Sequence, residues 1–205
     1  MHDKSAAWSV SVSKGVREIR EDDWDACANP PDWPYNPFLG HAFWLALEES
    51  GSASPRKGWA PCHLVLKDGG GAIAAIMPCY LKSHSYGEYV FDRSWAVAYE
   101  RAGGRYYPKL QTSVPFTPVS GRRILISPGG PEGKARALLS AAAVDVAKQN
   151  RASSWQMTFA TKEEWEALGA LNLLQRTDTQ YHWHNRGYGN FDDFLSALAS
   201  RTRTT

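Results

Sequence analysis

An amphipathic helix beyond residue 131 is the feature that most constrains how this chain can fold. It is preceded by Pro-Gly-Gly-Pro at 128–131, a sequence typical of a tight turn. Apolar residues then recur at helical spacing and form one stripe: Ala135, Leu138, Leu139, Ala142 and Val146. A stripe on one side of a helix must be buried against another element. We therefore expect this helix to cover a β-sheet.

Strands for that sheet are predicted on both sides of the helix. The apolar runs His63–Lys67 and Ala72–Pro78 are joined by Asp-Gly-Gly-Gly, which predicts a β-hairpin. A short strand is expected at 124–127. A half-buried strand is expected at 155–159, where apolar and polar residues alternate.

The remaining elements complete an α/β order. They are an irregular strand at 10–19, helices at 22–27, 41–49 and 163–171, a strand at 180–184, and a helix that Asn190 caps ahead of Asp192 and Asp193. This order predicts one α/β domain over residues 1–205, with a mixed, mostly antiparallel central sheet flanked by helices.

The charge balance gives no general attraction to nucleic acid or to an anionic membrane. The chain carries 23 basic and 21 acidic residues, for a formal net charge of +2. No apolar run is long enough to span a bilayer, and residues 1–14 lack the apolar core of a signal peptide. We expect a cytoplasmic protein with reduced thiols at Cys27, Cys62 and Cys79, and no metal site. A Cys62–Cys79 contact across neighbouring strands is the alternative.

Residues 78–118 combine aromatic and ionisable side chains at high density. The aromatic residues are Tyr80, Tyr86, Tyr89, Phe91, Trp95, Tyr99, Tyr106, Tyr107 and Phe116. A buried core avoids so many charges, and a solvated loop avoids so many rings. The mixture favours a concave surface in which rings form the walls of a ligand site.

Several strings resemble the FemAB-like predicted N-acyltransferases, a bacterial family. They are residues 37–39, 80–92, 95–96, 106–111 and 114–118, then 180–183 with Asn185, 187–188, 191–195 and Ser200–Arg201. The resemblance covers residues 16–201. It implies the fold of the GNAT superfamily of acyl-CoA-dependent N-acyltransferases and a link to peptidoglycan.

Acyl transfer to an amine or peptide-like acceptor is the activity that this resemblance implies. Such a reaction uses a base with a pKa near neutrality and donors that stabilise an oxyanion. The candidate bases are His84, Glu88 and Glu100. A lone residue of these types is more often an ordinary polar or ion-paired group, and Glu100 can equally form a structural salt bridge with Arg101.

An anionic acceptor is expected to meet Lys109 and Arg105, with tyrosines as its walls. A solvated edge with buried rings is the alternative. The residues expected to contact the acceptor are Lys82, Tyr86, Tyr89, Arg105, Tyr106, Tyr107, Lys109, Gln111, Phe116 and Thr117. Gln180, His182 and His184 share one face of the predicted strand, but without a third ligand they make a poor zinc site.

The superfamily resemblance implies that the pyrophosphate of a donor binds at the start of the helix beyond residue 131. The residues expected there are Ser127, Gly129, Gly130, Gly133 and Lys134. Pro128 and Pro131 remove backbone donors and Glu132 repels phosphate, so a plain strand-to-helix turn is the simpler interpretation. Acyl-CoA is the expected co-substrate, aminoacyl-tRNA is the alternative, and no permanently bound cofactor is expected.

Members of the resembled family continue beyond Ser200–Arg201 with a second, similar half, whereas this chain ends at Thr205. We therefore expect an N-terminal half that is inactive or incomplete by itself. It would expose an apolar surface for the second half or for another copy of the chain. Two further hypotheses stay open, namely a non-catalytic recognition domain for a cell-wall-related ligand and a structural, partner-binding remnant.

Overall fold

The computed structural model describes residues 7–90 and 92–198. Phe91, Ser200, Arg201 and Thr205, which belong to the predictions above, lie outside the described residues. The chain divides into two compact units, residues 1–173 and 174–205.

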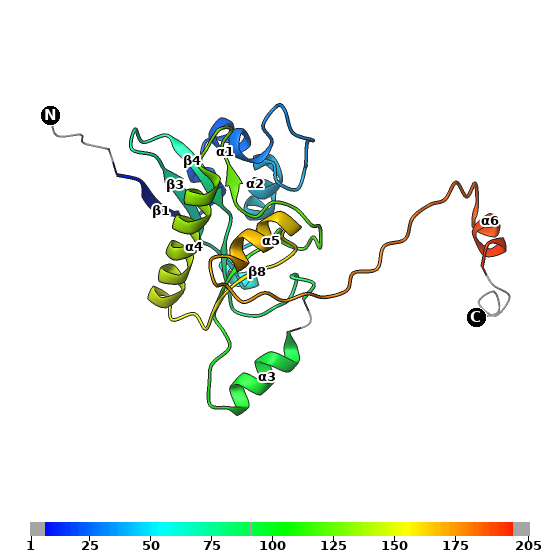
Figure 1. Ribbon diagram of the computed structural model, residues 1–205. Coiled ribbons are helices and arrows are strands. Elements are labelled where there is room, and N and C mark those ends of the chain that lie inside the picture. The colour runs from blue at the N-terminus through cyan, green and yellow to red at the C-terminus, as the bar shows by residue number, and fades with distance from the viewer. Residues whose placement is uncertain (1–6, 91, 199–205) are drawn as a thin grey trace. The chain divides into compact units, whose positions relative to one another are not determined.

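A long hairpin with an interrupted ladder organises the first unit, and its strands β3 and β4 are labelled in Figure 1. Its strands are β2 (Trp59–Pro61), β3 (His63–Lys67), β4 (Ile73–Met77) and β5 (Tyr80–Lys82). β3 pairs with β4 and β2 pairs with β5, both antiparallel. Between the two pairs, the Cys62 N–H donates to the Cys79 carbonyl at 2.9 Å. The strands therefore form one hairpin with a break, and the predicted pairing of its apolar runs is confirmed.

This hairpin supplies two strands to each of two four-stranded sheets. The first sheet has the order β1-β3-β4-β7 and adds β1 (Ser9–Ser13) and β7 (Leu125–Ile126), with every pair antiparallel. The second has the order β2-β5-β6-β8 and adds β6 (Lys109–Thr112) and β8 (Trp155–Met157), of which β6 and β8 are parallel. The predicted mixed, mostly antiparallel arrangement is confirmed, although the strands are divided between two sheets.

Helix α4 (Glu132–Gln149) buries the predicted apolar stripe against these sheets. Ala135, Leu139 and Val146 join one core cluster with Leu64 of β3 and Leu110 of β6. Leu138 and Ala142 pack at the margin of the same cluster. Helix α5 (Lys162–Gly169) follows β8, and its Thr161 hydroxyl accepts a hydrogen bond from the Glu164 N–H.

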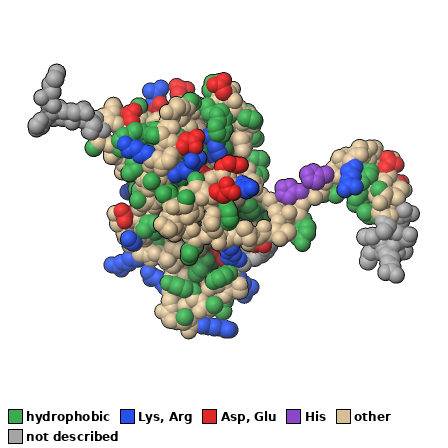
Figure 2. All heavy atoms as spheres, viewed as in Figure 1, with side chains coloured by type: hydrophobic (Ala, Val, Ile, Leu, Met, Phe, Trp, Pro, Cys, Tyr) green, Lys and Arg blue, Asp and Glu red, His purple; other side chains and the backbone are tan. Residues whose placement is uncertain are grey.

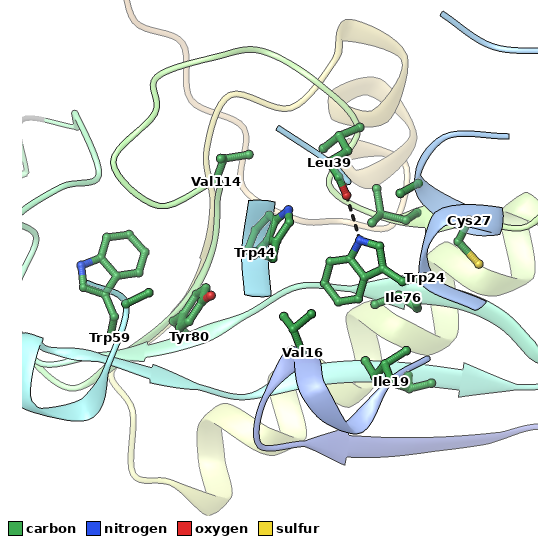
Figure 3. Packing of buried hydrophobic residues seen from close by; sticks show 14 residues of the cluster. Val16, Ile19, Trp24, Cys27, Leu39, Trp44, Trp59, Ile76, Tyr80 and Val114 are labelled. Carbon is green, nitrogen blue, oxygen red and sulfur yellow. Dashed lines mark hydrogen bonds between the residues drawn. The ribbon is translucent and has the colours of Figure 1, made fainter. Parts of the chain in front are cut away.

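A second core cluster lies under α1 (Glu21–Ala28), α2 (His41–Glu49) and a 3₁₀ turn, η1 (Val16–Glu18) (Figure 3). The Trp24 indole N–H donates to the Leu39 carbonyl at 2.8 Å, and that of Trp44 donates to Phe38 at 3.0 Å. Buried indoles need such partners. Trp44 also stacks on Tyr80, against which Trp59 packs edge-on. The start of β5 is thereby anchored to the helices.

Two segments differ from the sequence-based expectations. Helix α3 (Arg93–Arg101) forms where no helix was predicted. The strand predicted at Gln180–His184 is wrong, because these residues form no strand and their side chains are exposed. Alternation alone cannot hold a strand that has no neighbour to pair with. The predicted cap is confirmed, since Asn190 Oδ1 accepts from the Asp193 N–H at the start of α6 (Phe191–Ser196).

α3 carries exposed hydrophobic side chains, as Figure 2 shows. Trp95, Val97 and Tyr99 are 59, 38 and 47 % exposed. Among the described residues, no helix is both long and apolar enough to cross a membrane.

Candidate functional site

Four buried ionisable side chains, which we call the charge cluster, lie at the junction of β5, β6 and the loop that follows β5. They are Lys82, Glu88, Asp92 and Lys109, and none has a side chain more than 4 % exposed. Lys82 ends β5 and pairs directly with Lys109, the first residue of β6. Like charges in this position repel. The loop supplies the two carboxylates that balance them.

Lys109 is the best-satisfied member of the charge cluster. Its ammonium lies 2.7 Å from Glu88 Oε2 and 2.7 Å from Asp92 Oδ2, and it donates to Gln156 Oε1 at 3.1 Å. Burial acts to lower the pKa of Lys109, but the two carboxylates outweigh it and the pKa is raised. A lysine has three protons to donate, and all three have partners. Lys109 is therefore a structural cation with no donor left for a ligand.

Asp92 is held in its ionised form. Burial alone would raise its pKa, but hydrogen bonds from Lys109, Ser85 and Tyr106 outweigh burial and lower it. The hydroxyl groups of Ser85 and Tyr106 donate to Asp92 Oδ2 at 2.8 and 3.0 Å. Tyr107 completes the set, because its hydroxyl lies 2.7 Å from Ser85 Oγ.

Lys82 and Glu88 are less well paired. Lys82 Nζ lies 3.4 Å from the centroid of the Trp59 ring and 3.8 Å from Glu88 Oε1, and it donates to the Tyr86 carbonyl at 3.3 Å. Burial lowers the pKa of Lys82 to about 7, although Glu88 opposes the shift. Burial also raises the pKa of Glu88, whose Oε1 has no hydrogen-bond partner in the described part of the chain. The Lys82–Glu88 pair is therefore longer and less well hydrogen-bonded than the Lys109–Glu88 pair, which measures 2.7 Å.

An open hollow of about 530 Å³, which we call the Trp59 hollow, lies beside the charge cluster. Its lining residues are Ser52, Arg56, Lys57, Trp59, His84, Tyr86 and Phe116. They come from the 3₁₀ turn η2 (Pro55–Lys57) and the residues near it, the start of β2, and the loops after β5 and β6. The hollow thus joins aromatic walls to a basic rim.

Two glycines permit this close packing. Gly58 has a φ of +71°, and a Cβ there would lie 2.3 Å from His84 Nε2. Gly87 has a φ of +82°, and its Cβ would lie 2.5 Å from Phe116 Cδ1. Side chains disfavour this backbone region and would collide with the ring or imidazole. Both walls of the Trp59 hollow therefore depend on glycine.

His84 is a neutral imidazole at the wall of the hollow. Its pKa lies below the usual value because of burial and of the nearby Lys82 charge. Its Nδ1 accepts the Tyr86 N–H at 3.2 Å, and its ring packs against that of Tyr86 with centroids 5.0 Å apart. At neutral pH it has the protonation state that a general base needs.

The structure brings together eight of the 13 residues predicted as bases or acceptor contacts. The charge cluster, its hydroxyl partners and the hollow include Lys82, His84, Tyr86, Glu88, Tyr106, Tyr107, Lys109 and Phe116. Tyr89, Glu100 and Arg105 are exposed and do not line the hollow. Gln111 is buried and donates to Thr158 Oγ1, while Thr117 donates to the Pro115 carbonyl.

The predicted donor segment forms the turn between β7 and α4. Ser127 Oγ donates to the Ala74 carbonyl at 3.0 Å, and the Gly130 N–H donates to Ser127 at 2.9 Å. Gly129, Gly133 and Lys134 are exposed, and Lys134 Nζ lies 4.2 Å from the Trp8 ring centroid. None of these residues lines the Trp59 hollow.

Several residues of this region escaped the sequence-based prediction. Arg56 and Lys57 line the hollow, and Asp92 and Gln156 hold Lys109. In the sequence, the only feature that marks Arg56 and Lys57 is their position in a turn between Pro55 and Gly58. Gln156 lies 47 residues from Lys109, so only the β6–β8 pairing brings it close.

Metal and disulfide chemistry have no structural support within residues 7–90 and 92–198. No group of three His, Cys, Asp or Glu side chains there is placed to hold a metal. Cys27, Cys62 and Cys79 are buried free thiols, as the simpler interpretation expected. His182 and His184 are exposed, and His182 Nε2 contacts Gln180 Oε1 at 2.8 Å.

Solved structures with a similar arrangement include two N-acetyltransferases. One is the aminoglycoside antibiotic 6'-N-acetyltransferase AAC(6')-Ih from Acinetobacter baumannii, with 15 % identity and a TM-score of 0.46 over 88 % of this chain and 100 % of that chain. The other is a ribosomal-protein-alanine N-acetyltransferase from Brucella melitensis biovar Abortus 2308. It has 13 % identity and a TM-score of 0.47 over 88 % of this chain and 99 % of that chain.

No curated protein matches this chain significantly. A family model, in contrast, matches nearly all of the sequence, from residue 15 to residue 205. Its description is peptidoglycan biosynthesis/recognition. The chain belongs to the FemAB-like family.

Proposed function

We propose that this protein transfers an acyl or aminoacyl group to an amine-bearing acceptor and that the acceptor binds in the Trp59 hollow. Family membership supports a role connected with peptidoglycan. The observation that carries the proposal is a neutral His84 at the wall of a hollow lined by rings and cations. An amine acceptor is mostly an ammonium ion at neutral pH and must lose a proton before it can attack.

The proposed reaction needs one proton acceptor and a positioned electrophile. His84 takes the ammonium proton, and the free amine nitrogen then attacks the acyl carbon of the donor. The tetrahedral intermediate collapses, the carbon–sulfur or carbon–oxygen bond breaks, and the nitrogen loses its second proton, which the leaving group takes up. Positioning the two substrates supplies much of the acceleration. To act, His84 Nδ1 must release the Tyr86 N–H that it now accepts.

For the donor we propose acyl-CoA, with its phosphates near the start of α4. Ser127, Gly129, Gly130, Gly133 and Lys134 are the residues proposed to hold them. The first N–H groups of an 18-residue helix favour an anion. Aminoacyl-tRNA is the alternative donor, although a net charge of +2 gives it no independent support.

An activity assay tests this proposal. The purified chain is mixed with acetyl-CoA and a set of amines that includes amino sugars and lysine-containing peptides, and thiol release and acylated product are measured. We expect turnover that falls about 100-fold or more in His84→Gln. The exposed histidine variant His182→Gln is the matched control and should retain the wild-type rate. Equal rates in both variants would remove His84 as the base.

A recognition module is the second candidate function. Both the hydrogen bond to His84 Nδ1 and the full pairing of Lys109 favour it, because they leave few groups free for chemistry. It predicts that amine-bearing cell-wall fragments raise the midpoint of thermal unfolding while acetyl-CoA does not. An upward shift with acetyl-CoA would favour the enzyme instead.

For its cellular setting we propose the cytoplasm, and for its partner a second FemAB-like half or another copy of the chain. The exposed Val97 and Tyr99 of α3 support a contact surface of this kind. Sedimentation of the purified chain tests it. A strictly monomeric, non-aggregating sample would count against a self-association surface.

A further inference from the structure

We propose that Lys82 is a positioning residue, which fixes the orientation of the His84 imidazole through the backbone of Tyr86 and opposes a second positive charge there. Because His84 is the proposed base, this role rests on the proposed function, and it names the group on which that base depends. Lys82 is fully buried and does not line the Trp59 hollow, so it acts through His84 and not on a substrate.

Two hydrogen bonds connect Lys82 to His84 through a single residue. The Lys82 ammonium donates to the Tyr86 carbonyl at 3.3 Å, and the Tyr86 N–H donates to His84 Nδ1 at 3.2 Å. Because the first bond holds the backbone of Tyr86, it also holds the N–H that His84 accepts. A neutral imidazole that accepts at Nδ1 carries its proton on Nε2. Lys82 therefore fixes Nδ1 as the basic nitrogen, which is the atom that the proposed reaction uses.

The Lys82 ammonium is itself held in one place. Its Nζ lies 3.4 Å from the centroid of the Trp59 ring and 3.8 Å from Glu88 Oε1. Strand pairing sets Lys82 opposite Trp59 on β2 and opposite Lys109 on β6. Salt and solvent screen a buried charge much less than an exposed one. A charge on Lys82 is therefore felt by the side chains around it.

This charge disfavours an imidazolium at His84. Burial is the main reason why the pKa of His84 is lowered, and the charge of Lys82 adds to it. The pKa of Lys82 is about 7, whereas that of His84 lies below its ordinary 6.5. Lys82 therefore carries most of its charge over the pH range in which His84 takes up a proton.

The ionisable groups that face Lys82 balance one another. Glu88 favours the charged form of Lys82, and Lys109 on the neighbouring strand opposes it. Asp92 lies beyond Lys109, at 2.7 Å from that ammonium. Burial is what lowers the pKa of Lys82, so the position is a costly one for a charge.

The other ionisable groups beside His84 are open to water. Arg56 and Lys57 share the lining of the hollow with His84, but both are exposed, and so is Tyr86. Solvent screens their effect on the imidazole. Among the charged groups around His84, Lys82 is therefore the one whose influence burial preserves.

Stability gives no reason for a lysine at position 82. A methionine is similar in length and would fill the same space without the cost of a buried charge. Glu88 Oε1, which faces Lys82, also has no hydrogen-bond partner in the described part of the chain. Groups that reduce stability and have shifted pKa values concentrate where a function needs them.

NMR titration of the His84 imidazole tests the proposal without any substrate. The ring signals of the full chain are followed from about pH 4 to pH 8 and assigned by their loss in His84→Gln. Lys82→Met removes both the charge and the donor, whereas Lys82→Gln removes the charge and keeps an N–H for the Tyr86 carbonyl. At the pH that half-protonates His84 in wild type, we expect more than half of the rings to be protonated in both variants.

The ring nitrogen signals report the tautomer separately. We expect only the Nε2–H form in wild type and in Lys82→Gln, and a mixture with the Nδ1–H form in Lys82→Met. The exposed lysine variant Lys148→Met is the matched control and should titrate like wild type. An unchanged His84 titration in both Lys82 variants would overturn the role of the charge. A pure Nε2–H form in Lys82→Met would overturn the role of the Tyr86 backbone.

For the proposed reaction, the consequence is a shift along the pH axis. The acidic limb of kcat/KM follows protonation of the base in the free enzyme, so we expect it at higher pH in Lys82→Met. A merely structural effect would lower the rate by the same factor at every pH. A wild-type rate in His84→Gln would remove the proposed base and leave the titration as it is, whereas a wild-type titration in the Lys82 variants would remove this inference alone.

Discussion

The Lys82 ammonium lies 3.4 Å from the centroid of the Trp59 ring, and that same ring lines the hollow. Trp59 is itself 0 % exposed, so this contact between the ammonium and the ring is buried, and the exposed rings of the hollow are those of Tyr86 and Phe116. A charged Lys82 is attracted to the electron-rich face of the indole, whereas a neutral amine is attracted far less. Because the pKa of Lys82 is about 7, small changes around Trp59 alter the charge beneath it.

Lys82→Met should change how stability depends on pH. The folded pKa of about 7 lies below the ordinary value of 10.5, so between these values the unfolded chain binds a proton that the folded chain lacks. Lys82 therefore makes the free energy of unfolding rise with pH across this window, and its penalty is greatest at and below pH 7. We therefore expect Lys82→Met to have a higher free energy of unfolding than wild type, and we expect this difference to be largest near pH 7.

Urea unfolding at several pH values between 7 and 10 measures this difference. The exposed lysine variant Lys148→Met is the control and should track wild type throughout. A difference between Lys82→Met and wild type that stays constant with pH would contradict the lowered pKa.

Lys109→Met should be severely destabilising. It leaves Glu88 and Asp92 as two buried carboxylates with their main cation gone, a change that typically costs about 3–5 kcal/mol. Adding Glu88→Gln should restore part of the loss, because one uncompensated charge is then removed. Equilibrium unfolding at pH 7 measures both variants.

For comparison, Lys162→Met breaks an exposed ion pair with Glu166 and should cost less than about 1 kcal/mol. Lowering the pH should help Lys109→Met more than wild type, since protonation neutralises the carboxylates left behind. A loss in Lys109→Met no larger than in Lys162→Met would show that the cluster contributes little.

Gly87→Ala should both destabilise the fold and damage the hollow. The positive φ alone costs about 1–2 kcal/mol for a residue with a side chain. The new Cβ would also collide with Phe116, whose ring must move. Gly51 is the matched control, because it has a φ of +75° and no atom within 4 Å of its Cβ position. We expect Gly87→Ala to lose more stability than Gly51→Ala, measured by thermal unfolding, and equal losses would argue against the close Gly87–Phe116 packing.

The thiols should be inert in the native protein. Burial raises the pKa of Cys27 to about 12 and also raises the pKa of Cys62 and of Cys79. The thiolate is the reactive form, so an aromatic disulfide reagent at pH 8 should release little product from the folded chain. In denaturant all three free cysteines should react. Rapid native reaction, or fewer thiols after unfolding, would contradict buried, reduced cysteines.

Local patterns predicted much of the fold. The hairpin turn is visible in sequence because Asp68 Oδ1 accepts the Gly70 and Ala72 N–H groups, an interaction within five residues. The stripe of α4 and the Asn190 cap are equally local. The strand predicted at 180–184 failed because strand formation depends on a partner that alternation cannot reveal.

The sequence predicted which residues belong to the candidate site better than it predicted how those residues are arranged. Lys82, Glu88 and Lys109 were all expected in it, but Lys109 and Glu88 are 21 residues apart and their pairing depends on how the loop after β5 folds back. Arg56 and Lys57 were missed for a similar reason. They are distant in sequence from Tyr86 and Phe116, with which they line the hollow, and their short turn has no recognisable sequence pattern. Burial then turns Lys109 from an expected ligand contact into a satisfied structural cation.

Trp59 belongs at once to the core cluster and to the lining of the hollow. An attempt to redesign ligand preference at this indole would therefore also loosen the packing on Tyr80 that anchors β5. Arg56 and Tyr86 are exposed on a turn and a loop and belong to neither core cluster, whereas Phe116 packs against Trp59. Selection or laboratory engineering can therefore alter Arg56 and Tyr86 with less effect on packing than Phe116 or Trp59.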